Sequence, residues 1–182
     1  SIVDYLNQMF GNDIRAIIPQ ISMSAGTMMA LSCKEIIMGK QSNLGPIDPQ
    51  MGGVACQAVL DEFQKAKDDI KVNPQAAPLW QAIISKYHPT FLGACKNSID
   101  WSEKLAFGWL NRNMCNGDLQ RTEKILKEFS DHETNKSHSR HIPKDKCKEI
   151  GLAIVDMEDD NVLQDLILTV HHSFMHTFAH SS

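Results

Sequence analysis

The chain has 182 residues, 42% of them hydrophobic and 22% charged, and a formal net charge of −4 at pH 7. These values are typical of a globular chain with a real core, and the absence of a basic, aromatic-rich stretch argues against nucleic-acid binding. No apolar run approaches the roughly 18 residues of a membrane span. Five widely spaced cysteines, with no Cys-x-x-Cys pair, indicate free thiols in a reducing compartment such as the cytoplasm.

Helices and strands alternate in the first part of the chain. An amphipathic pattern that stops at Gly11-Asn12 predicts the first helix, and two continuous apolar runs predict strands of a parallel sheet covered on both faces. A longer apolar periodicity predicts a further helix, which a segment with two prolines ends. In order, these elements are a helix at 2–10, strands at 14–18 and 35–38, and a helix at 54–70.

Most of the remaining chain predicts helices. Their boundaries come from His88-Pro89, from Asn116-Gly117 and from a polar stretch at 130–142. One short strand is expected before the last helix. The predicted elements are helices at 79–87, 92–116, 121–129 and 143–152, a strand at 153–155 and a helix at 161–179.

This order predicts an α/β layer followed by a helical extension. We expect a single domain over residues 1–182, with the core at 1–72 and a mainly helical part at 73–182. The chain opens with Ser1-Ile2-Val3, already inside the first predicted helix and without an initiator Met. This opening predicts that the sequence is the C-terminal fragment of a longer protein.

The segment from Ala16 to Leu31 carries the clearest functional signal. An apolar run passes through a corner of small residues, Ser22 to Gly26, and continues into a predicted buried helix. A serine at such a corner exposes its hydroxyl, and the first amides of the helix lack intrahelical partners and can hold an anion. Acyl transfer needs this combination of a nucleophile and an oxyanion donor. The alternative is that Ser22 or Ser24 only caps the helix.

The residues that follow extend the pattern. A second strand ends in Met38-Gly39, and a turn-rich loop then reads Ser42-Asn43-Leu44-Gly45-Pro46-Ile47-Asp48-Pro49-Gln50. The order of strand, Ser-Ala-Gly corner, helix, strand and loop resembles the serine dehydrogenase proteinase family, a branch of the ClpP/crotonase superfamily related to signal peptide peptidase A. The resemblance is most specific at residues 17–50, extends through 79–110, and is looser after about residue 120.

The resemblance implies a ClpP/crotonase-like layered fold, a parallel sheet with helices, and ATP-independent hydrolysis of peptide bonds without a cofactor or metal. It implies that Ser24 is the nucleophile and that the backbone amide of Ala25 is one oxyanion donor. Relatives carry a strand and a glycine-rich loop ahead of the first helix, and that loop supplies a second donor, so the N-terminal part of the fold is expected to be missing. Superfamily precedent implies a homo-oligomer that acts on peptide or protein substrates, and the missing segment could hold it to a membrane.

The general base is less clear. Superfamily peptidases use a histidine about 25 residues after the serine or a lysine at the start of the next helix, but this chain has no histidine near Asp48 and has Gln57 at the lysine position. Lys65 lies roughly 12 Å further along that helix; it is either a base reached by another route or part of a solvated face. Asp48 is either a base whose pKa is raised by burial or a turn former in its Asp-Pro pair.

Two alternatives to a peptidase remain. The same fold could serve as an acyl-CoA-type hydrolase or as a catalytically silent binding and assembly subunit, which the missing base and glycine-rich loop favour. The other alternative is a helical interaction module in which Ser24 is only a cap. An amino-acid dehydrogenase is not supported, because the chain lacks a Gly-x-Gly-x-x-Gly nucleotide fingerprint.

Cysteine and histidine placements have competing interpretations. Cys56 is either a thiol of lowered pKa or a buried structural cysteine. Two histidine tracts have the spacing of metal ligands, but no cysteine or carboxylate stands at a ligand interval, so solvated or hydrogen-bonded histidines are expected. Arg140 or His141 could approach the active-site cleft. The tracts are His132, His138 and His141 in a polar segment, and His172, His176 and His180 on the last helix.

Overall fold

The computed structural model describes residues 1–130 and 140–181. The chain divides into two compact units, which we call unit 1 (Ser1–Ile47 with Ala106–Ser182) and unit 2 (Asp48–Leu105). Unit 2 is therefore an insertion in the sequence of unit 1. The predicted boundary between 1–72 and 73–182 falls inside unit 2, and the last part of the chain belongs to the same unit as the first.

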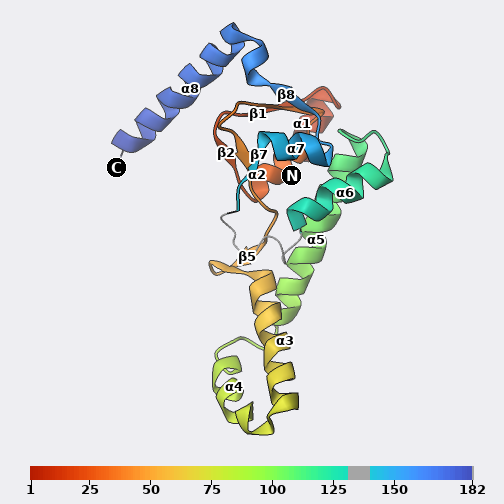
Figure 1. Ribbon diagram of the computed structural model, residues 1–182, viewed down its shortest axis with the longest axis vertical. Helices are drawn as coiled ribbons and strands as arrows, with labels where there is room; N and C mark the ends of the chain where they lie inside the picture. The colour runs from red at the N-terminus through yellow and green to blue at the C-terminus, as the bar shows by residue number, and fades with distance from the viewer. Residues whose placement is uncertain (131–139, 182) are drawn as a thin grey trace. The chain divides into compact units, whose positions relative to one another are not determined.

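A parallel three-stranded sheet forms the framework of unit 1 (Figure 1). The register pairs Ala16 with Ile36, and Ile36 with Ile154. All three predicted strands and the predicted parallel arrangement are confirmed, with ends that shift by one residue at most. The strands are β1 (Arg15–Ile18), β3 (Glu35–Met38) and β8 (Ile154–Asp156), in the order β1-β3-β8.

Side chains of β3 alternate between the two faces of this sheet. Ile36 and Met38 are fully buried in the main core of unit 1, together with residues of α2, α6, α7 and the end of α5. Ile37 packs against Met157 and Ile167, so α8 covers the other face. Burial on both faces explains the continuous apolar run in the sequence. The helices are α2 (Ala25–Leu31), α5 (Phe91–Arg112), α6 (Leu119–Ser130), α7 (Lys144–Ile150) and α8 (Asn161–His180).

Helix ends follow the capping signals in the sequence. Ser1 is the N-cap of α1 (Ile2–Phe10): its hydroxyl accepts from the Asp4 amide while the Asp4 carboxylate accepts from Ser1. Gly151 is the C-cap of α7, and Asp160 is the N-cap of α8, where its carboxylate accepts hydrogen bonds from two backbone amides. The first predicted helix is confirmed in both its ends. The predicted helices at 79–87, 92–116, 121–129, 143–152 and 161–179 correspond to α4, α5, α6, α7 and α8, with ends that differ by up to four residues.

A second, smaller sheet is missing from the sequence-based prediction. Ser22 lies opposite Leu44 in a parallel pair, and Leu44 lies opposite Ile142 in an antiparallel pair. Strands of two residues leave no periodicity in a sequence, so only the tertiary structure defines them. The sheet leads directly into Ser24. Its strands are β2 (Ile21–Ser22), β4 (Asn43–Leu44) and β7 (Ile142–Pro143), in the order β2-β4-β7.

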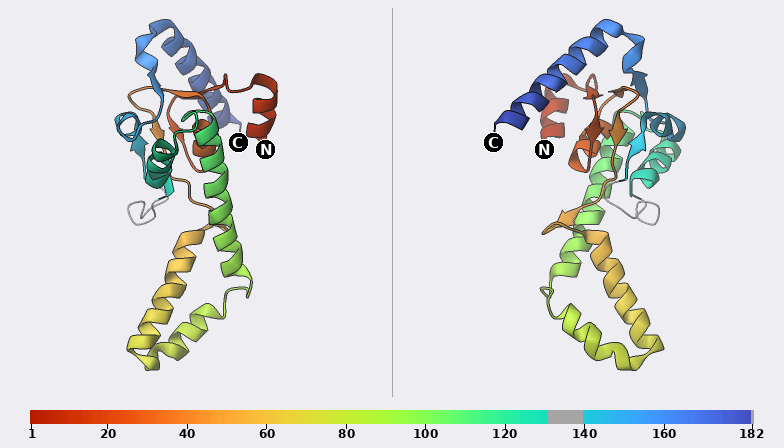
Figure 2. Two further views of the ribbon diagram at one scale, coloured as in Figure 1. Left: turned by 90° about the vertical axis from the view of Figure 1, so that its right-hand side faces the viewer. Right: turned by 60° about the vertical axis from the view of Figure 1, so that its left-hand side comes forward.

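Unit 2 consists of a short hairpin and helices. After α3 the chain reverses direction, and α4 and the start of α5 run back (Figure 2). Tyr87, which follows α4, contacts α3: its hydroxyl donates to Glu62 at 2.7 Å and its ring packs against Phe63. The helix predicted at 54–70 begins two residues late, since its first two residues form a strand. The elements are β5 (Gln50–Met51), β6 (Val54–Ala55), α3 (Cys56–Val72), η1 (Pro74–Ala76) and α4 (Ala77–Ile84).

Across residues 1–130 and 140–181, no helix has the length and apolar character that crossing a membrane would require.

Candidate active site

The Ser22–Gly26 corner is where the sequence predicts the nucleophile. β2 ends at Ser22 and α2 begins at Ala25. Ser24 lies between them with φ 49° and ψ −116°, a conformation that is costly for a residue with a Cβ. Strain of this kind, of order 1–3 kcal/mol, persists only where the surrounding structure imposes it, and it concentrates at functional sites. A strained serine at a strand-to-helix turn is also the geometry that exposes a nucleophile.

The Ser24 hydroxyl does not cap α2, although Ser24 occupies the N-cap position. Its side chain is half-buried and forms no hydrogen bond with any other described residue of unit 1. The neighbouring Ala25 is exposed, and its amide is likewise unbonded within the described part of unit 1, whereas the Gly26 amide donates to the Met23 carbonyl at 2.8 Å. The interpretation of Ser24 as a helix cap is therefore wrong.

The buried hydroxyl of Thr27 contacts the backbone at the serine corner, where β2 and β4 end. Its side chain is fully buried, and its hydroxyl lies 2.8 Å from the Ser22 carbonyl and 2.9 Å from the Gly45 carbonyl. The Gly45 amide donates to the same Ser22 carbonyl at 2.8 Å. These bonds tie the first turn of α2 to the ends of β2 and β4. Sequence reasoning missed Thr27; its signal is a polar residue within the apolar run of a buried helix.

Two glycines allow the corner to close. A Cβ on Gly26 would lie 2.5 Å from the Ser22 hydroxyl oxygen, and a Cβ on Gly45 would lie 2.2 Å from the Met23 sulfur. Contacts this short force one of the two groups to move. A larger residue at either glycine would therefore crowd Ser22 or the side chain of Met23, the two residues that precede Ser24.

Replacing Thr27 by valine is expected to lower the free energy of unfolding by about 1–2 kcal/mol, because valine keeps the shape but leaves the buried Gly45 carbonyl without a donor. Thr27→Ser is the matched control and should lose less, since it keeps the hydroxyl. Urea denaturation, monitored by circular dichroism, measures the free energy of unfolding of both variants. A Thr27→Val variant as stable as the wild type would show that the hydroxyl does not hold the corner.

The candidate bases belong to unit 2, whereas the serine corner belongs to unit 1. Asp48 is buried, with 6% of its surface exposed, and Lys65 is exposed on α3. Gln57, at the position where the resemblance implies a lysine, donates to Asp61 one turn along the helix at 2.7 Å. The assignment of Asp48 or Lys65 as the general base stays a prediction.

Cys56 is a buried structural cysteine. It is fully buried in a cluster with Val59 and Cys95. Burial raises the pKa of its thiol to about 11, and the neighbouring Cys95 and the charge of Asp48 contribute to the increase. The interpretation of Cys56 as a thiol of lowered pKa is therefore wrong, and the structural alternative is confirmed.

Arg140 and His141 directly precede β7, which pairs with β4 in the small sheet. The register of β2, β4 and β7 places Ser22, Leu44 and Ile142 in one transverse row. Two strand spacings separate the backbones of Ser22 and Ile142 by roughly 10 Å, and Met23 and His141 each adjoin that row in the sequence. Arg140 forms an ion pair with Glu128 at 2.5 Å. His141 is exposed and lines a pocket beside β2.

The described residues contain no group of His, Cys, Asp or Glu arranged to hold a metal ion. The terminal row of His172, His176 and His180 is exposed on α8, and the rings of His176 and His180 stack with centroids 4.2 Å apart. His132 and His138 lie outside the described residues. What the described site offers chemically is a serine hydroxyl beside an available backbone amide.

Two proteins of Methanocaldococcus jannaschii are similar to this chain. It is 25% identical over 154 residues to the uncharacterized protein MJ0137 of Methanocaldococcus jannaschii, and the match covers 85% of this chain and 46% of that protein. The uncharacterized protein MJ1495 of the same organism is 37% identical over 54 residues, which are 30% of this chain and 18% of that relative. The chain therefore spans less than half the length of either relative. No solved structure matches it significantly.

The family comparison agrees with the geometry. The model of the ClpP-like SDH-type serine proteinases matches residues 6–162. That range contains the serine corner, both sheets of unit 1 and the whole of unit 2. The resemblance predicted from residues 17–50 is confirmed, and so is the layered α/β fold. The chain belongs to the family of ClpP-like SDH-type serine proteinases.

Proposed function

We propose that this protein is a serine peptidase that hydrolyses peptide bonds through an acyl-enzyme on Ser24, without ATP. The observation that carries the proposal is the conformation of Ser24, a strained residue at a strand-to-helix corner whose hydroxyl caps nothing. Membership of a serine proteinase family supports the same chemistry.

The reaction follows the usual course of acyl transfer. Ser24 Oγ attacks the carbonyl carbon of the scissile bond while a general base, for which Asp48 and Lys65 are the candidates, takes the hydroxyl proton. The oxyanion accepts a hydrogen bond from the Ala25 amide at the start of α2. The base then delivers the proton to the leaving amine, and water hydrolyses the acyl-enzyme by the same steps in reverse.

A second candidate function has an observation of its own. Within the described part of unit 1, no side chain pairs with the Ser24 hydroxyl, as a base must do to activate it. A catalytically silent or acyl-CoA-type member of the same fold, acting as a binding or assembly subunit, is compatible with that geometry.

Labelling with a fluorophosphonate probe separates the two functions, because only an activated serine reacts with it. The full-length wild type is compared with Ser24→Ala, and Ser22→Ala, two residues earlier on the same corner, is the matched control. The peptidase proposal expects labelling of the wild type and of Ser22→Ala but not of Ser24→Ala. An unlabelled wild type would contradict it, and an acyl-CoA binding assay would then test the alternative.

The partners and the location of the protein stay predictions. The family resemblance supports a peptide or protein substrate and a homo-oligomeric state. The composition supports a cytoplasmic location without a nucleic-acid partner.

A further inference from the structure

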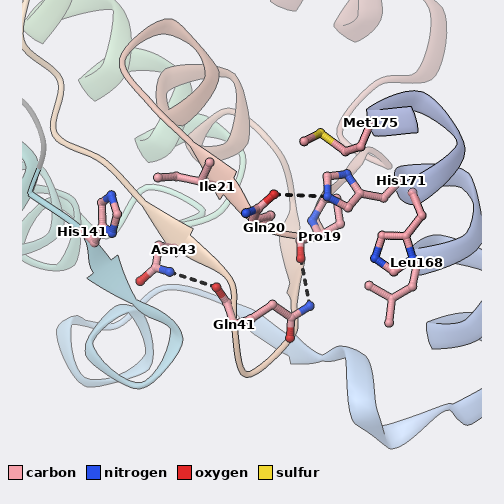
Figure 3. Close-up of a pocket in the computed structure, with 10 residues that line it drawn as sticks. Pro19, Gln20, Ile21, Gln41, Asn43, His141, Leu168, His171 and Met175 are labelled. Atoms are coloured by element: carbon pink, nitrogen blue, oxygen red, sulfur yellow. Dashed lines mark hydrogen bonds between the residues drawn. The ribbon is translucent and has the colours of Figure 1, made fainter. Parts of the chain in front are cut away.

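A pocket of about 480 Å³ lies beside the strand that leads to Ser24 (Figure 3). Its walls come from the turn between β1 and β2, from β4 and the turn before it, from α8, and from His141 ahead of β7. All of these segments belong to unit 1. The volume lies within the range of pockets that bind small ligands.

Hydrogen-bonding side chains without a permanent charge make up the polar part of the wall. Of the ten described lining residues, three are histidines and three are carboxamides, and none carries a carboxylate, ammonium or guanidinium group. The other four are apolar. The polar residues are Gln20, Gln41, Asn43, His141, His171 and His172.

Hydrogen bonds within the wall orient these side chains. His171 Nε2 lies 3.3 Å from Gln20 Oε1, and Figure 3 shows the two side chains pointing toward each other. Because a carboxamide oxygen only accepts, His171 is the donor and the Gln20 NH2 group stays available to a ligand. Gln41 Nε2 donates to the Pro19 carbonyl and Asn43 Nδ2 to the Gln41 carbonyl, each at 2.9 Å. Both amides keep one further N–H.

The pocket lies within reach of a substrate held at Ser24. Ile21 lines the pocket and precedes Ser24 by three residues, which span at most roughly 11 Å of extended chain. Ile142, which follows His141, lies in the same transverse row of the small sheet as Ser22. An extended peptide advances about 3.3 Å per residue, so the pocket corresponds to a substrate position about two to four residues from the cleaved bond.

We propose that this pocket is a specificity subsite that receives the side chain of an aspartate or glutamate of the peptide substrate. The inference rests on the proposed peptidase function. A carboxylate only accepts hydrogen bonds, and the amide N–H groups of the wall, together with the imidazole N–H groups of His141 and His172, supply the donors. A lysine or arginine of the substrate would meet no anionic partner among the described lining residues.

A binding test on the full-length Ser24→Ala variant is independent of catalysis. Two short fluorescein-labelled peptides of alanine, valine and threonine are compared, one with a central aspartate and its matched twin with asparagine at that position. Fluorescence anisotropy measures the dissociation constant of each peptide. We expect the aspartate peptide to bind at least about tenfold more tightly, as charge-assisted hydrogen bonds are roughly twice as strong as neutral ones.

Variants of the wall test whether this preference comes from the pocket. Replacing His172 or His141 by leucine should reduce the preference to less than about twofold, because each change removes an imidazole donor. His176→Leu makes the same chemical change on α8 outside the pocket and should keep the full preference. Circular dichroism confirms that each variant is folded.

Cleavage by the wild type provides the second readout. When the aspartate moves along the peptide by one position, the cleaved bond should move with it, which mass spectrometry of the products shows. Equal binding of the twin peptides, or binding of neither, would overturn the subsite. A preference for aspartate that persists while the wild type neither cleaves peptides nor reacts with fluorophosphonate would instead overturn the peptidase function and leave a carboxylate site in place.

Discussion

Replacing Ser24 by glycine is expected to abolish peptide hydrolysis and to leave a fold about 1 kcal/mol more stable than that of Ser24→Ala. The φ of 49° at Ser24 is a conformation that glycine adopts without steric cost. The strain of a residue with a Cβ there is of order 1–3 kcal/mol. The greater backbone freedom of glycine in the unfolded chain offsets about 0.5–1 kcal/mol of the gain. Alanine removes the same hydroxyl but keeps the strain.

Two measurements on the same variants separate strain from chemistry. Hydrolysis should fall to background in both, a loss of about 10⁶-fold where a nucleophile acts with a complete set of partners. Urea denaturation should place Ser24→Gly above Ser24→Ala in stability. Asn116→Gly is the control, because Asn116 also has a positive φ, of 50°, and is exposed. That variant should keep full activity. Equal stability of Ser24→Gly and Ser24→Ala would show that the corner is not strained.

The features that could be predicted from the sequence are those that depend on neighbouring residues. The continuous apolar run Ile36-Ile37-Met38 predicts the buried strand β3, because both faces of a covered parallel strand need apolar side chains. The serine corner is visible because a tight strand-to-helix turn needs small residues in sequence. Gly26 has that reason in the structure, where a side chain would meet Ser22.

Features that depend on distant residues were not visible in the sequence. The small sheet joins three two-residue strands, one of them about a hundred residues from the others, and no local pattern encodes such a register. The pocket beside β2 takes Gln20 from a turn and His171 from the last helix. Neither residue belongs to a motif, so only the fold shows that their side chains meet. The insertion of unit 2 likewise depends on which segments pack together.

A cluster of charges around Lys144 illustrates the same dependence on distant residues. The residue is 8% exposed, and its ammonium lies 2.6 Å from Asp156 Oδ1 and 2.9 Å from Glu158 Oε2. Glu158 also accepts from the backbone amide of Lys40 at 2.6 Å, and Lys148 pairs with Asp156. These contacts join the start of α7 to the end of β8 and to the turn after β3. They close the carboxyl end of the parallel sheet.

The cluster makes the stability of unit 1 sensitive to acid. Hydrogen bonds from Lys144 and Lys148 hold the pKa of Asp156 below its ordinary value of 3.8. Burial acts to raise the pKa of Glu158, but the bonds from Lys144 and Lys40 outweigh it and hold that pKa below 4.5. A carboxylate whose pKa is depressed by folding contributes stability that is present above its ordinary pKa and lost as the pH falls through the folded-state value.

Lys144→Met is therefore expected to lower the free energy of unfolding at pH 7 by about 3 kcal/mol, the lower end of the range for broken buried ion pairs, because the two carboxylates are partly exposed. Methionine keeps much of the apolar packing of the lysine stem, so the loss reports the charge. Lys146→Met is the matched control on the same helix; its surface pair with Glu149, at 2.8 Å, should contribute little to stability.

Urea denaturation at pH 7, 5 and 3 measures the free energy of unfolding of both variants. The deficit of Lys144→Met should shrink toward pH 3, because protonating the carboxylates removes the same interaction from the wild type. A deficit of equal size at pH 3 and pH 7 would mean that Lys144 stabilises the fold by packing and not by charge.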